Sequence, residues 1–113
     1  MAKHAWVEEF AGSVLVCDPD GIILEMNARS VASYAEDGGL GLIGKNLFNC
    51  HSEASQTTLK SMMEARTTNV YTISKKGKKK LIYQSPWYEE GEYRGFIEIS
   101  VEIPEDMAHF NRG

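Results

Sequence analysis

The sequence lacks the features that mark several large classes of protein. Its two cysteines, Cys17 and Cys50, do not have the C-x-x-C spacing of metal and redox motifs, so we expect neither a disulfide framework nor a zinc site. We see no signal peptide and no apolar run that could span a bilayer, and we therefore expect a cytoplasmic chain or the soluble piece of a receptor. The formal net charge of −4 gives no electrostatic reason to expect nucleic-acid binding.

The sequence also lacks a recognisable set of catalytic residues. No nucleophile stands beside a base, and no pair of carboxylates is spaced for acid–base work. Covalent and acid–base catalysis both depend on such pairs. We therefore do not expect an enzyme.

The clearest local signal is a turn at residues 18–21, Asp-Pro-Asp-Gly, between two apolar runs. Residues 13–17 and 22–26 are rich in β-forming side chains. Proline fixes one backbone angle of such a turn, and glycine accepts the positive φ that other residues resist. The sequence therefore predicts a β-hairpin near the start of a single domain, since 113 residues suffice for one hydrophobic core.

Helices are predicted on either side of this hairpin. Apolar residues at i, i+4 and i+8 predict an amphipathic helix over residues 1–10. Asn27 and Ser52 are suited to cap the helices that follow them, because their side chains can accept a hydrogen bond from the first turn. We expect these helices to run to about Tyr34 and Arg66.

The last third of the chain is rich in β-forming residues. Three strands are expected, over residues 69–74, 80–88 and 93–103. Pro86 within the second of them predicts a bulge or an edge position. Pro104 ends the last strand, and residues 105–110 are expected to start an outgoing helix. Tight turns between strands predict an α+β domain with an antiparallel sheet and its helices on one face.

Four segments carry a resemblance to a known family. They are residues 14–23 (VLVCDPDGII), 27–28 (NA), 42–48 (LIGKNLF) and 88–96 (YEEGEYRGF). In this order and at these separations they resemble four parts of a PAS domain. These are the first hairpin, the start of the first helix, the family's Leu/Ile-Gly-Lys/Arg segment and the last hairpin. The segment 49–51 (NCH) is also similar to one subgroup of the family.

The resemblance implies a fold and a division of the chain. PAS domains have a five-stranded antiparallel sheet in the spatial order 2-1-5-4-3, with helices on one face enclosing a small cavity. We expect an N-terminal flanking helix at 1–12, the PAS domain at 13–103 and the start of a C-terminal linker helix at 104–113. The family's usual Asp-Ile-Thr/Ser closing motif is replaced by SVEIPED at 100–106.

The resemblance also implies a class of function. We expect a sensory module of a bacterial signal-transduction protein, for example in a two-component system or a transcription regulator, that binds a small ligand or cofactor. Its effector domain would lie beyond either terminus. The alternative is a ligand-free module that dimerises or binds another protein.

Candidate cavity residues come from the predicted helix at 52–66, from the connector before it and from the strands. By period-two alternation, inward-facing residues of the last three strands would line the cavity. Among polar groups there, Tyr83, Gln84 and Ser85 could orient a ligand. The candidate contacts to a ligand or cofactor are His51, Met62, Met63, Tyr83, Ser85 and Leu47.

His51 is also a candidate for haem binding. It lies close to the position where haem-binding PAS domains place an axial histidine, and neutral imidazole is a good iron ligand. The alternative, which we favour, is that His51 caps or hydrogen-bonds the helix start. Cys50 could be a redox-sensing thiol at a helix start, or a small buried apolar residue. Flavin is not expected, because the signature around a flavin-binding cysteine is missing.

Two aromatic residues near the start are candidates for a homodimer interface. Trp6 and Phe10 lie on the apolar side of the predicted first helix. They must pack on this domain's sheet or on a partner chain. A homodimer is therefore expected through Trp6, Phe10 and the sheet face.

Overall fold

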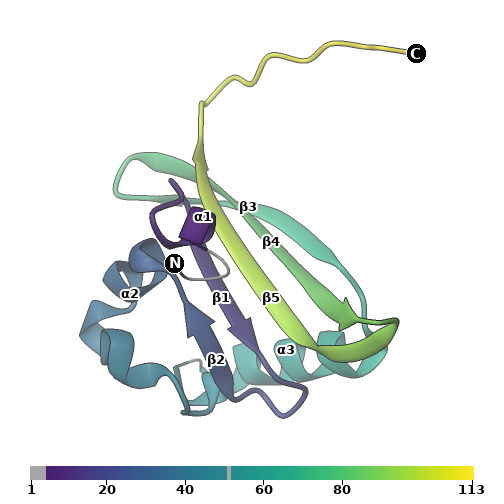
Figure 1. Cartoon of the computed structure of the whole chain (residues 1–113). Coiled ribbons are helices and arrows are strands. Elements are labelled where there is room, and N and C mark those ends of the chain that lie inside the picture. Colours follow the sequence, from purple (N-terminus) through teal and green to yellow (C-terminus); the bar gives the residue numbers. More distant parts are fainter. Residues whose placement is uncertain (1–4, 51) are drawn as a thin grey trace.

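The centre of the molecule is one five-stranded antiparallel sheet. The computed structural model describes residues 5–50 and 52–113, with the backbone alone at 49 and 50. The strands are β1 (Ser13–Cys17), β2 (Ile23–Met26), β3 (Asn69–Lys75), β4 (Lys78–Glu89) and β5 (Glu92–Ile103). Their order in space is β2-β1-β5-β4-β3 (Figure 1). The α+β class and the strand order are confirmed.

The helices are short, apart from one. They are α1 (Ala5–Glu8), α2 (Ala28–Ser33), α3 (Glu53–Ala65) and the 3-10 turns η1 (Ala35–Asp37), η2 (Gly39–Leu42) and η3 (Leu47–Cys50). Both predicted caps are present: Asn27 Oδ1 accepts from the Ser30 N–H at 3.1 Å, and Ser52 Oγ accepts from the Ser55 N–H at 3.3 Å. None of the helices in the described part of the chain has the length and apolar content needed to cross a bilayer.

The first hairpin forms at the predicted turn. Asp18 Oδ1 accepts hydrogen bonds from the N–H groups of Asp20 and Ile22, each at 2.9 Å, as aspartate commonly does in turns. Gly21 has a φ of +85°, the region that glycine adopts most readily. β2 starts one residue later than expected, because Ile22 instead forms an isolated bridge with Asn46.

Pro86 lies in β4 at a place where that strand has an unpaired edge. β3 reaches only to Asn69, which lies opposite Gln84, so it stops short of Pro86. On its other side Pro86 pairs with Phe96 of β5, and the register shifts one residue further along. A residue without an N–H is tolerated at such an edge. The prediction of an edge or bulge is confirmed.

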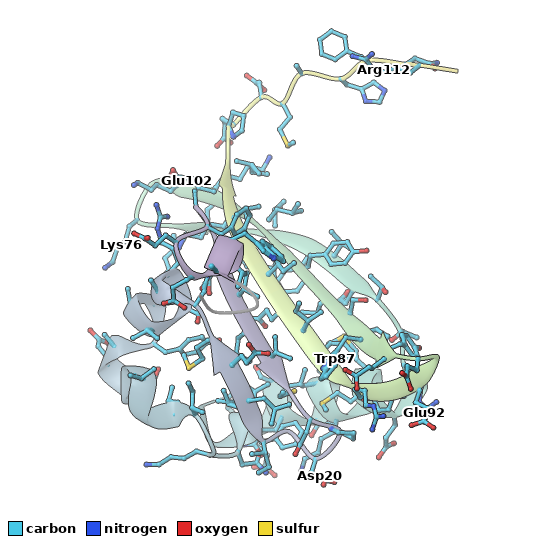
Figure 2. All side chains as sticks on the ribbon, viewed as in Figure 1. Asp20, Lys76, Trp87, Glu92, Glu102 and Arg112 are labelled. Atoms are coloured by element: carbon cyan, nitrogen blue, oxygen red, sulfur yellow. The ribbon has the colours of Figure 1, made fainter. Side chains whose placement is uncertain are left out.

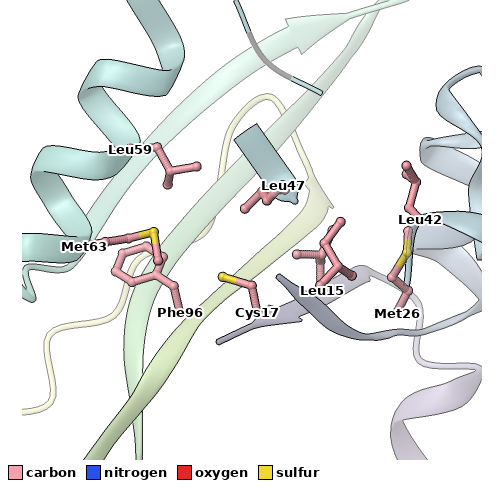
Figure 3. Close-up of a cluster of buried hydrophobic side chains, with 9 residues drawn as sticks. Leu15, Cys17, Met26, Leu42, Leu47, Leu59, Met63 and Phe96 are labelled. Carbon is pink, nitrogen blue, oxygen red and sulfur yellow. The ribbon is translucent and has the colours of Figure 1, made fainter. Parts of the chain in front are cut away.

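The hydrophobic core lies on the inner face of the sheet, beneath α2, the 3-10 turns and α3 (Figure 3). Alternate residues of the central strands, such as Leu15, Cys17 and Phe96, point into it and are almost fully buried. Of α3, only Leu59 and Met63 are buried. Burial raises the pKa of the Cys17 thiol to about 11, so this cysteine is a packing residue.

The two terminal segments differ from expectation. The described part of the first predicted helix is helical only over Ala5–Glu8, and this helix lies in front of the sheet, away from α3 (Figure 1). The predicted helix after Pro104 is wrong: residues 104–113 have no regular structure and extend away from the sheet. Figure 2 places Asp20 and Glu92 at one end of the sheet and Lys76 and Glu102 at the other.

Gly95 allows β1 and β5 to approach closely. It has a φ of +138°, and a Cβ placed there would overlap the carbonyl oxygen of Cys17 and crowd Asp18. The same carbonyl oxygen accepts a hydrogen bond from Trp87 Nε1 at 3.1 Å. A side chain at residue 95 would therefore have to displace backbone at the end of the β1–β5 pairing.

We predict that Gly95→Ala lowers the free energy of unfolding by about 3 kcal/mol or more, through strain and a backbone clash. Gly91→Ala is the matched control, since Gly91 also has a positive φ of +81° but open space around a Cβ, and should cost about 1 kcal/mol. Urea denaturation measures both values. Equal losses in the two variants would contradict the close approach.

Candidate functional site

An open cleft lies between α3 and the inner face of β3, β4 and β5. Its volume is about 490 Å³, which is within the range of small-molecule sites. Its lining residues are Ala54, Ser55, Thr58, Leu59, Met62, Asn69, Tyr71, Ile73, Ile82, Gln84 and Glu98. The backbone of α3 makes few close approaches to any strand, and only Leu59 and Met63 of this helix are buried, which leaves room for the cleft.

A chain of hydrogen bonds forms the polar part of the cleft. Gln84 Nε2 donates to Glu98 Oε2 at 2.8 Å, and Asn69 Nδ2 donates to Gln84 Oε1 at 3.3 Å. The Tyr34 hydroxyl donates to Glu98 Oε1 at 3.4 Å. Gln84 is buried, so these bonds hold its amide in one orientation and fix the carboxylate beside it.

Tyr71 adds a hydroxyl to this polar group. Burial, and then the nearby Glu98 carboxylate, raise the pKa of Tyr71, while a hydrogen bond with Gln84 lowers it in part. Both raising effects disfavour the phenolate. The Tyr71 hydroxyl therefore stays protonated at neutral pH and can donate a hydrogen bond.

The larger side chains of the remaining walls are apolar, while Ser55 and Thr58 add hydroxyl groups from α3. Leu59 and Met62 come from α3, while Ile73 and Ile82 come from β3 and β4. The cleft thus combines apolar side chains with fixed polar groups on the sheet and two hydroxyl groups on α3. This is the usual composition of a site for a small organic molecule.

The structure separates the predicted cavity residues. Met62 lines the cleft, whereas Met63 and Leu47 belong to the core. Tyr83 and Ser85 do not line it, and this expectation is corrected. They alternate along β4 with Ile82 and Gln84, which do line the cleft, so they lie on the opposite face.

Haem binding through His51 stays a prediction, because His51 lies outside the described residues. The described lining of the cleft contains no histidine or cysteine, and Met62 is its one side chain with sulfur. These described residues do not form a haem site without a further ligand.

The sequence analysis missed Glu98, Asn69 and Tyr71. The alternation of β5 could have found Glu98, because it lies two residues after Phe96 on the same face. An acidic residue on an otherwise core-facing row is unusual and indicates a special environment. The pairing of Asn69 with Gln84 depends on the register between β3 and β4, which the local sequence does not fix.

A second groove lies on the outer face of the sheet, between α1 and strands β1, β2 and β5. Its volume is about 670 Å³, and apolar side chains such as Val7, Val14, Val16 and Ile97 line it together with Trp6. Trp6 is 75% exposed and Phe10 is 41% exposed. The two predicted interface residues therefore present apolar surface beside an apolar sheet face.

The side chain of Asn27 holds α1 against this face. Its Nδ2 donates to the carbonyl oxygens of Val7 at 3.0 Å and Gly12 at 2.8 Å. Its Oδ1 accepts from the N–H groups of Val14 at 2.9 Å and Ser30 at 3.1 Å. One buried amide thus joins α1, β1 and α2.

The geometry of the sheet is shared with solved structures. A C-terminal domain from Streptococcus mutans has a TM-score of 0.71 at 15% identity, over 86% of this chain and 79% of that one. The PAS domain of BvgS from Bordetella pertussis has a TM-score of 0.64 at 16% identity, over 88% and 82%. The Aer2 receptor from Vibrio cholerae, a dual PAS-haem oxygen sensor, has a TM-score of 0.61 at 17% identity, over 82% and 95%. No protein-family model and no curated protein matches the sequence. The chain has the fold of a PAS domain, as the resemblance implied.

We predict that Asn27→Ala lowers the free energy of unfolding by about 3 kcal/mol, because it removes a helix cap and leaves buried backbone groups without partners. Ser52→Ala removes only an exposed cap and should cost about 1 kcal/mol. Hydrogen exchange at the Val14 amide should accelerate far more in Asn27→Ala than in Ser52→Ala, because only the first substitution removes the acceptor of that amide. Unchanged exchange at Val14 would show that the amide does not hold this junction.

Proposed function

We propose that this chain is the sensory module of a signal-transduction protein and binds a small molecule in the cleft beneath α3. The observation that carries the proposal is the polar group of Gln84, Glu98 and Tyr71, fixed beside the apolar side chains of the cleft. A cleft of this size with convergent polar groups is the usual form of a ligand site. An effector domain would lie beyond either terminus.

The PAS fold supports this proposal by likeness, since one of the similar structures is an oxygen-sensing receptor. Fold alone does not determine function, so the main support for ligand binding is the cleft itself. Because α3 is loosely packed on the sheet, a ligand could change the position of this helix. A molecule that contacts both α3 and the sheet would favour closure of the helix onto the sheet.

A second candidate function is a homodimerisation module, and the outer groove favours it. Trp6 is mostly exposed beside an apolar sheet face, and exposed aromatic side chains of this kind are common centres of protein interfaces. A second copy of the chain that packs on this face would bury Trp6 and part of Phe10. The two functions are compatible, because the cleft and the groove lie on opposite faces.

We predict that native mass spectrometry of the purified protein shows a bound small molecule, and that Thr58→Trp removes it by filling the cleft. Thr57→Trp is the matched control: both threonines lie exposed on α3 and donate to a backbone carbonyl one turn earlier, but only Thr58 lines the cleft. A protein that carries nothing, or a Thr58→Trp variant that keeps its ligand, would contradict ligand binding in this cleft.

We predict a homodimer in sedimentation-velocity experiments, with a dissociation constant that Trp6→Ala raises by about tenfold or more. Leu40→Ala is the control, since Leu40 is 64% exposed in η2 and does not line the outer groove, and it should leave the constant unchanged. A chain that stays monomeric at every concentration, or equal effects of both substitutions, would argue against dimerisation through α1.

A further inference from the structure

We propose that the ligand of the cleft is an organic cation, a protonated amine or amidine on an apolar body, whose charged group binds Glu98. This inference rests on the proposed function, in which the cleft binds a small molecule. It adds the chemical class of that molecule. The argument comes from the charge, the free acceptor positions and the apolar walls of the cleft.

The charge of the cleft has one sign. Apart from the Tyr71 phenol, Glu98 is the one ionisable side chain among the described lining residues of the cleft. No described lysine or arginine forms an ion pair with Glu98. Lys80 lies two residues before Ile82 on β4 and is not part of the lining. A half-buried carboxylate without a positive partner favours a cation that approaches it.

The basic side chains of and just after α3 are engaged elsewhere. Lys60 Nζ lies 4.9 Å from the centre of the Phe48 ring, and the Arg66 guanidinium lies 4.4 Å from the centre of the Tyr93 ring. These contacts turn both cations toward aromatic rings outside the cleft lining. The helix therefore does not supply the missing positive charge.

Glu98 keeps acceptor positions for a ligand. A carboxylate offers about four acceptor positions, and Gln84 and Tyr34 use one on each oxygen. The bond from Tyr34 is long at 3.4 Å, so Gln84 is the stronger partner. Because Asn69 in turn holds Gln84, the carboxylate is oriented before a ligand arrives, which lowers the cost of binding.

The donor set fits an organic cation better than a metal ion. No group of three or more His, Cys, Asp or Glu that could hold a metal occurs among the described residues, whereas Ca²⁺ needs about six to eight oxygen ligands. Leu59, Met62, Ile73 and Ile82 instead offer apolar contact to a carbon skeleton. An ammonium or amidinium group needs only the carboxylate and neighbouring acceptors.

Three probes of one shape and different charge test this inference: phenethylamine, 2-phenylethanol and phenylacetate. Each is titrated into isotope-labelled protein, and backbone amide shifts of the lining residues give the dissociation constant. We expect phenethylamine to bind about tenfold or more tighter than phenylacetate, and Glu98→Gln to weaken phenethylamine binding by a similar factor. Glutamine can still accept the hydrogen bond from Gln84, so the variant should fold.

Glu102→Gln is the matched control. It removes the same charge from the same strand, but Glu102 is exposed and pairs with Lys78 at 3.3 Å outside the cleft, so phenethylamine affinity should not change. Equal binding of all three probes, unaffected by Glu98→Gln, would overturn the cation inference and leave ligand binding intact. If none of the three probes bound, the cation inference would also be overturned. Native mass spectrometry of Thr58→Trp and Thr57→Trp would then test ligand binding in the cleft separately.

Discussion

The pairing of β1 with β5 is the constraint on which the rest of the molecule depends. It runs from Ser13 opposite Ser100 to Cys17 opposite Phe96, and Gly95 lets the two backbones approach at its end. This register puts Leu15, Cys17 and Phe96 into the core, and it sets Glu98 opposite Leu15 on the same inner face. A shift of one residue would exchange the two faces and remove the carboxylate from the cleft.

Local chemistry explains why much of the fold could be predicted from the sequence. The turn at Asp18, the caps Asn27 and Ser52 and the position of Pro86 each depend on a few neighbouring residues. Local chemistry does not determine the order of the strands, because hydrophobic patterns do not say which strands are neighbours. That order came from the resemblance to PAS domains, and the structure confirms it.

The predictions that were wrong or incomplete share one physical cause. The stability of a short helix and the position of a side chain depend on residues far away in the sequence. The helix expected after Pro104 has suitable end signals, but isolated helices of this length are marginal in water, and residues 104–113 extend away from the sheet. The polar side chains of Tyr83 and Ser85 suit a cavity chemically, but alternation along β4 puts only Gln84 on the same face as Ile82. The orientation of the Glu98 carboxylate depends on the hydrogen bond from Gln84, which the register between β4 and β5 places opposite it.

The cleft and the outer groove lie on opposite faces of one sheet, and we propose the cleft as the ligand site. The most direct measurement is a crystal structure of the protein with the molecule that co-purifies with it. We expect this molecule to lie between α3 and β3–β5, with a nitrogen within about 3.2 Å of a Glu98 carboxylate oxygen. A structure in which Leu59 and Met62 pack directly on Ile73 and Ile82 and leave no space for a ligand would contradict it.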